Sequence, residues 1–118
     1  MKTTFTRIAK LGRKDPKPLW AMGLKIGEES GELLEAVNHH LGMLPHKKMK
    51  EPLMGEVADV IQNAIAIAAK AYPKLTLAEL ITDIEYQMNL KTDKWEKAIG
   101  TFDKPKARSA PEAGEERT

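Results

Sequence analysis

Apolar residues recur at helical spacing along three long stretches of the chain. The first stretch runs from about Leu19 to Leu41, and its apolar positions stand four or seven residues apart: Met22, Ile26, Leu33, Val37 and Leu41. Side chains at these spacings lie on one face of an α-helix, so the pattern predicts an amphipathic helix. Gly42 follows directly and is a typical residue for ending a helix.

A second helix is predicted from about Glu51 and Pro52 to Ala71, with the proline tolerated in the first turn. Its apolar side chains form one broad face: Val57, Val60, Ile61, Ala64, Ile65, Ile67 and Ala68. At about 100° per residue this face covers roughly 200° of the circumference, more than a helix packed on one side needs. We therefore expect the chain to self-associate, as a helical bundle shared between subunits.

Thr76 starts the third predicted helix, because Glu79 follows it at the spacing of a capping box. Gly100 is expected to end this helix. Between these two positions the apolar side chains again recur at helical spacing: Leu77, Leu80, Ile81, Ile84, Met88 and Trp95. The pattern predicts a long helix with one buried face.

Two further segments complete the chain. In residues 3–11, Phe5, Ile8 and Leu11 are three apart and predict a short helix or arm before the first long helix. From Thr101 onward, prolines, a glycine and scattered charges are typical of a flexible tail. No stretch alternates as a strand would. The expected fold class is therefore all-α, with a helical domain over residues 1–100, completed by oligomerisation, and a tail over residues 101–118.

Composition limits the class of protein. There are no cysteines among the 118 residues, which excludes disulfides, thiolate metal sites and thiol catalysis and fits a reducing compartment. The longest apolar stretch, around residues 57–69, is interrupted by polar residues and is too short to span a membrane. The start of the chain does not resemble a secretory signal. We expect a cytoplasmic protein that does not act on a membrane.

Basic residues are concentrated in two places although the formal net charge is only +2. Such a small net charge does not argue for a nucleic-acid partner, and none is expected. Seven basic residues precede the first glutamate, and Lys47, Lys48 and Lys50 form a second run. These clusters are either ordinary solvated surface or a rim that attracts phosphate groups.

Acidic side chains interrupt the apolar face of the first long helix. Glu29 projects within about 40° of Leu33, inside the apolar stripe, and Glu32 lies about 60° further round, at its border. An ionised carboxylate in an apolar stripe needs a cation, a hydrogen-bond donor or water. Lys25, one turn before Glu29, can supply part of that charge.

The second predicted helix carries a similar pair. Glu56 and Asp59 are three residues apart, and Asn63 lies one turn beyond Asp59. If the two helices pack antiparallel, both carboxylate pairs can converge on one point. Hard oxygen ligands without cysteine favour Mg²⁺ or Mn²⁺ over zinc. The alternative is solvated surface, because a pair of glutamates three apart is common on helices.

The segments Glu28–Leu33, with the sequence EESGEL, and Gly55–Val60, with GEVADV, resemble the paired signature of the MazG-like nucleotide pyrophosphohydrolases. That all-α superfamily also includes dimeric dUTPases and dCTP pyrophosphatases, and the resemblance covers residues 19–97. It implies Mg²⁺-dependent cleavage of a nucleoside triphosphate between the α- and β-phosphates, which yields a monophosphate and pyrophosphate. It also implies a homodimer or a dimer of dimers.

The resemblance also implies roles for individual residues. Glu29, Glu32, Glu56 and Asp59 would be the metal ligands, and Glu28 with Glu29 would form the catalytic pair, Glu28 orienting or deprotonating the attacking water. Residues that would contact the substrate are Lys25, Asn89, Lys91 and Lys94. The last three do not match the family pattern cleanly, so the contacts to base and phosphate are the least defined part of the assignment. Asn63 faces the same side as Asp59 and can either hydrogen-bond the sugar or base of a substrate or be a polar residue satisfied at a helix contact.

Two other functions remain open from the sequence. The same scaffold can serve as a non-catalytic binding or regulatory module. A di-metal oxidoreductase bundle is disfavoured, because His39 and His40 do not have the Glu-x-x-His spacing of that class.

Overall fold

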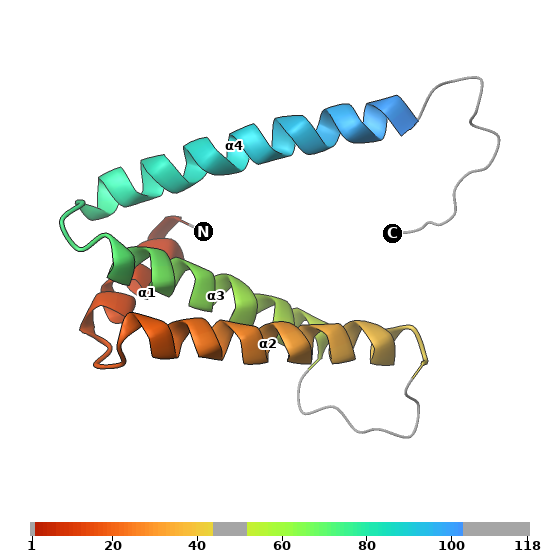
Figure 1. The fold of residues 1–118 in the computed structure, drawn as a ribbon, viewed down its shortest axis with the longest axis horizontal. Helices are drawn as coiled ribbons and strands as arrows, with labels where there is room; N and C mark the ends of the chain where they lie inside the picture. Colours follow the sequence, from red (N-terminus) through yellow and green to blue (C-terminus); the bar gives the residue numbers. More distant parts are fainter. Residues whose placement is uncertain (1, 44–51, 103–118) are drawn as a thin grey trace. The chain divides into compact units, whose positions relative to one another are not determined.

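The protein, described here from a computed structural model, is all-helical over residues 2–43 and 52–102, the part of the chain that the structure describes. Four helices follow one another: α1 (Lys2–Lys14), α2 (Leu19–His40), α3 (Leu53–Ala71) and α4 (Leu77–Phe102). The expected all-α class is thus confirmed, without strands in the described residues (Figure 1). The chain divides into two units, Met1–Ile81 and Thr82–Thr118.

Most local signals in the sequence start and stop the helices as expected. Gly100 is the exception: it does not end the last helix, because α4 continues to Phe102 and a helix tolerates an interior glycine at a cost of about 1 kcal/mol. Pro18 and Pro52 are the extended residues that precede α2 and α3, so each proline stands just outside the first turn. Gly42 adopts a φ of +79°, the left-handed conformation that ends α2. Before α4, the backbone N–H of Glu79 donates to Thr76 Oγ1 at 3.1 Å, and Thr76 N–H donates to Glu79 Oε1 at 2.8 Å. The predicted capping box is therefore formed.

Within the first unit, α3 is the central helix. It runs antiparallel to α2 and packs against both α2 and α1 (Figure 1). Most of the buried apolar side chains are small or medium in size: Ala9, Met22, Ala36, Ile65, Ala69, Leu80 and Ile81. The N-terminal segment is a full helix of 13 residues rather than a short arm, and it covers a second side of α3. The broad apolar face of α3 is thus partly explained by a neighbour within the chain.

The contact between α1 and α3 is close at Gly12. A Cβ placed on this glycine would lie 2.8 Å from Ala66 Cα and 2.9 Å from Ala66 O. Both atoms belong to the backbone of α3, so the two helices approach within the space that any larger residue would need. Gly12 therefore determines how near α1 can come to α3.

Arg13, the next residue, binds the carbonyl end of α3. Its Nε donates to Ala69 O at 3.0 Å, and its Nη2 donates to Tyr72 O at 2.7 Å and Leu75 O at 2.8 Å. In return, Lys70 Nζ donates to Asp15 O. The last carbonyls of a helix have no partner within it, so these bonds satisfy groups that would otherwise need water. They tie α1 to the α3–α4 connection.

In the second unit, the described residues form a single helix, the part of α4 from Thr82 onward. It has no other described element in its unit that could cover an apolar face. The predicted tail from Thr101 lies almost entirely outside the described residues, as do Lys47, Lys48 and Lys50.

Candidate metal centre

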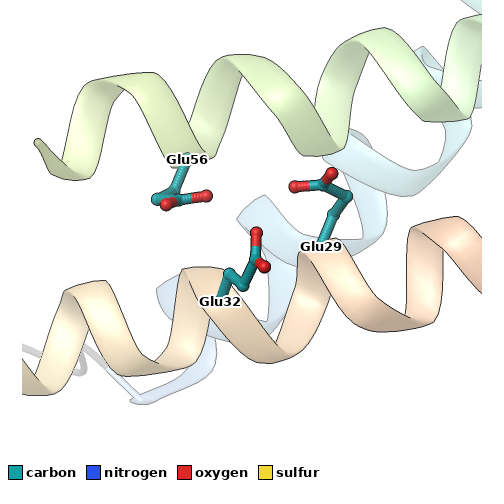
Figure 2. A group of neighbouring side chains, drawn as sticks. All are labelled: Glu29, Glu32 and Glu56. Atoms are coloured by element: carbon teal, nitrogen blue, oxygen red, sulfur yellow. The ribbon is translucent and has the colours of Figure 1, made fainter. Parts of the chain in front are cut away.

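Three carboxylates from two helices converge between α2 and α3. One carboxylate oxygen each of Glu29, Glu32 and Glu56 lies within 4.8 Å of the other two. Figure 2 shows Glu29 and Glu32 rising from one helix and Glu56 descending from the other, with the three carboxylates pointing toward one another. In the residues that the structure describes, this is the one cluster of three or more acidic or histidine side chains. The expected convergence of the two acidic segments is therefore present for these three residues.

Glu29 is buried, as its predicted place in the apolar stripe of the helix implies. It retains 7% of its exposure and Glu56 retains 5%, whereas Glu32 is exposed at the border of the stripe. Glu29 Oε1 is buried and accepts no hydrogen bond from the described residues. A buried carboxylate oxygen without a donor is costly in free energy unless a cation approaches it. The arrangement thus has the charge and the open coordination that a bound cation requires.

Lys25 neutralises one edge of the cluster. Its Nζ lies 3.2 Å from Glu29 Oε2 and 3.3 Å from Glu28 Oε1. The hydrogen bond to Glu29, with the bond and the charge of Glu28, raises the pKa of the Lys25 ammonium. Lys25 therefore stays protonated beside the cluster and leaves Glu29 Oε1 open. Glu28 is held on the outer side of this pair, with its side chain largely exposed.

Glu32 holds its proton more tightly than an ordinary glutamate. Although the residue is exposed, loss of solvation around its carboxyl, followed by the negative charge of Glu29, raises its pKa above the ordinary value for glutamate. A metal ion binds the ionised form, so a proton must leave before Glu32 can act as a ligand.

The raised pKa predicts how metal affinity depends on pH. Because Glu32 stays protonated to a higher pH than a free glutamate, Mn²⁺ affinity is expected to be weaker at pH 5 than at pH 7.5, with proton release on binding. Calorimetry in two buffers of different ionisation enthalpy measures the affinity and the number of protons released.

The folding stability of the metal-free protein should depend on pH in the opposite direction. The contribution of Glu32 to stability is fully present below its unfolded pKa and is lost as the pH rises through its folded pKa. In the metal-free Glu32→Gln variant, the free energy of unfolding should therefore depend less on pH than in the wild type. An identical pH dependence would contradict the raised pKa of Glu32.

The other predicted site residues are not gathered in this cluster. Asp59, one turn after Glu56 on α3, is half-buried and is not among the three carboxylates that share the 4.8 Å separation. An aspartate carries its carboxylate one methylene nearer to its own helix, which shortens its reach. Asn63 turns back along α3, where its Nδ2 donates to Asp59 O at 2.8 Å. Ligation by Asp59 and substrate contact by Asn63 remain predictions.

Asn89, Lys91 and Lys94 belong to the second unit, where all three are exposed on α4. Their predicted contact with a substrate stays a prediction. The buried face predicted for the last helix does not extend to Met88 and Trp95, which are 59% and 66% exposed, because no other described element of their unit covers them. On α2, Trp20 is 71% exposed. Sequence reasoning had not singled out the rest of the exposed face of α2, although glycines at Gly23, Gly27 and Gly31, four apart, mark it in the sequence.

No helix in the described part of the chain is long and apolar enough to cross a membrane. In comparisons with protein-family models, with curated proteins and with solved structures, no match to this chain was found.

Proposed function

We propose that this protein is a Mg²⁺-dependent nucleoside triphosphate pyrophosphohydrolase, which cleaves between the α- and β-phosphates. One observation carries the proposal. Carboxylates from α2 and α3 face each other, and the buried Glu29 among them has an oxygen that no described donor binds. The donors are all oxygen atoms, which suits Mg²⁺ or Mn²⁺ rather than softer ions.

In this proposal, Glu29, Glu32 and Glu56 hold the ion, with Asp59 as a fourth ligand. The metal would screen the charge of the triphosphate and lower the pKa of a bound water. Glu28 stands at the edge of the cluster, and its largely exposed carboxylate is free to accept a proton from water when Lys25 moves toward a phosphate. Lys25 would contribute charge neutralisation, the main requirement in phosphoryl transfer. The oxygen-only ligand set, without histidine, gives no support to redox chemistry at this centre.

The resemblance of the EESGEL and GEVADV segments to the MazG-like pattern supports the choice of substrate class. Hydrolysis of other phosphate esters would need the same kind of metal site, so this choice rests on the motif and not on the cluster alone. A homodimer, or a dimer of dimers, and a cytoplasmic location are part of the same proposal.

A hydrolysis screen tests it directly. The purified chain is incubated with each common ribonucleoside and deoxyribonucleoside triphosphate, with Mg²⁺ and with EDTA, and the products are separated by chromatography. We expect monophosphate and pyrophosphate with at least one substrate, and only with the metal. Release of diphosphate and orthophosphate would refute cleavage at the α–β bond. Binding of Mn²⁺ without turnover of any triphosphate would instead identify a non-catalytic metal-binding module.

A further inference from the structure

The face of α2 opposite the metal cluster is apolar and exposed. At about 100° per residue, five of its positions lie within roughly 40° of one line, about 180° from Glu29. Trp20, Leu24 and Leu34 are 71%, 69% and 62% exposed. None of the five positions is charged: Trp20, Leu24, Gly27, Gly31 and Leu34, called here the α2 seam. Exposed apolar surfaces of this kind mark places where another element binds.

The middle of the α2 seam is open. A Cβ placed on Gly27 or Gly31 would have no atom within 4 Å apart from its own local helix. The larger side chains of Leu24 and Leu34 stand on either side of this gap. The surface therefore has room for a bulky side chain at the glycines, with apolar contacts above and below.

The second unit carries a matching line of residues. From Ile84 the spacing along α4 is four, three, four and three, the same order as in the α2 seam. Four of these positions are exposed and the first is half-buried. They are Ile84, Met88, Lys91, Trp95 and Ala98, called here the α4 seam. Within its own unit no other described element covers them.

We propose that the α4 seam of a second copy of this chain packs in parallel against the α2 seam. In the matching register each position pairs with the one 64 residues later. Trp95 then lies on Gly31 and Ala98 on Leu34, so large residues meet small ones in both layers. An aromatic side chain in an open, apolar gap is the common anchor of a protein interface.

Charge favours this pairing over the alternatives. One border of the α2 seam is acidic, with Glu28 and Glu35. The opposite border of the α4 seam carries Lys94, and Lys91 lies in the α4 seam itself. In parallel packing the borders on opposite sides of the two seams meet, which brings the lysines to the acidic border. Two α2 helices packed antiparallel would instead place two acidic borders together. Two parallel α2 helices would stack glycine on glycine and leave the gap unfilled.

Each copy carries both seams, so a dimer with two-fold symmetry would contain this contact twice. This inference rests on the homodimer of the proposed function and specifies its interface. The contact involves Glu28, Lys91 and Lys94, whereas the three clustered carboxylates take no part in it. Mn²⁺ binding is measured on each variant to distinguish failure of the interface proposal from failure of the proposed function. A chain can bind Mn²⁺ without dimerising through these seams, and it can dimerise without binding Mn²⁺.

Sedimentation velocity of the full chain tests the surfaces. The wild type should dimerise, and Trp95→Ala and Gly31→Leu should each weaken the dimer by about tenfold or more, the effect of an emptied or overfilled packing position. Tyr86→Ala is the matched control, since Tyr86 is an exposed aromatic residue on the other side of α4 and should leave the dimer unchanged. A monomeric wild type, or a Gly31→Leu chain that dimerises equally well, would overturn the proposal.

Disulfide trapping tests the partner. The chain has no cysteine, so introduced thiols have no competitor. Leu34→Cys and Ala98→Cys chains, purified separately, mixed and oxidised mildly, should give the mixed disulfide in clear excess over either self-linked dimer. Leu34→Cys with Asp93→Cys, on the far side of α4, should not link. Predominant self-linking of Leu34→Cys or of Ala98→Cys, or no mixed product in a chain that dimerises, rules out this pairing.

Discussion

Replacing Glu29 by glutamine is expected to abolish divalent-metal binding and to raise the stability of the metal-free protein. Glu29 is the buried member of the cluster on α2, and one of its carboxylate oxygens lies within 4.8 Å of an oxygen of Glu32 and of Glu56. The amide is nearly the same size but is a weak ligand for Mg²⁺, so the coordination loses a charged donor. Without metal, the same change removes one of three like charges that repel each other, and the new N–H₂ can donate to a neighbouring carboxylate. The change also ends the ion pair with Lys25, but Lys25 keeps Glu28 as a partner, so the relief of repulsion is expected to outweigh this loss.

Thermal unfolding with and without Mn²⁺ measures both parts. A ligand at about one hundred times its Kd stabilises the folded state by about 2.7 kcal/mol, so the wild-type Tm should rise clearly with metal. Glu29→Gln should show a higher Tm than the wild type without metal and no rise with it. If the proposed function holds, hydrolysis should also fall by about a thousandfold or more, because the metal supplies several kcal/mol of charge stabilisation.

The matched control is Glu85→Gln, which removes the same charge from an exposed position in the second unit. It should leave the metal-induced rise in Tm unchanged. If Glu29→Gln retained a wild-type rise, the cluster would not be the metal site.

A single methyl group at Gly12 is expected to destabilise the protein. Glycine to alanine inside a helix normally stabilises it by about 1 kcal/mol, because alanine loses less backbone entropy. At Gly12, however, the new Cβ would lie 2.8 Å from Ala66 Cα. Neither backbone can yield without moving a whole helix, so α1 must shift away from α3 and strain its Arg13 contacts. We expect a net loss of about 1–3 kcal/mol in the free energy of unfolding.

Urea denaturation of Gly12→Ala and Gly23→Ala, at one protein concentration, measures the difference. Gly23 is also helical, and a Cβ there would meet nothing within 4 Å. Gly23→Ala should therefore shift the midpoint upward while Gly12→Ala shifts it downward. If both substitutions stabilised the chain equally, α1 would not be packed closely on α3.

Much of the local structure could be predicted because it depends on neighbours within a few residues. Helical spacing placed Glu29 in the apolar stripe, and the residue is indeed buried. The threonine–glutamate spacing at Thr76 and Glu79 predicted a capping box, and both hydrogen bonds form. Rules of three and four residues apply wherever a helix forms, whatever packs around it.

The candidate site could be predicted only in part. The spacing indicated two acidic pairs, but how far each side chain reaches toward the other helix depends on how α2 and α3 dock. Three carboxylates meet, and Asp59 is not among them. The direction of the Asn63 amide was not predictable either, since a helix offers its own carbonyl one turn earlier as a competing acceptor.

What the sequence by itself determined is the helical class, most of the helix ends and the burial of one glutamate, because these follow from regular backbone geometry. Only the tertiary structure decided that α1 lies against α3, through Gly12 and Ala66, and that Arg13 binds carbonyls 56 to 62 residues away. Such contacts depend on shape and on the direction of whole helices. No local sequence pattern predicts these contacts, because a glycine or an arginine near a helix end occurs in the same sequence context whether it faces water or another backbone.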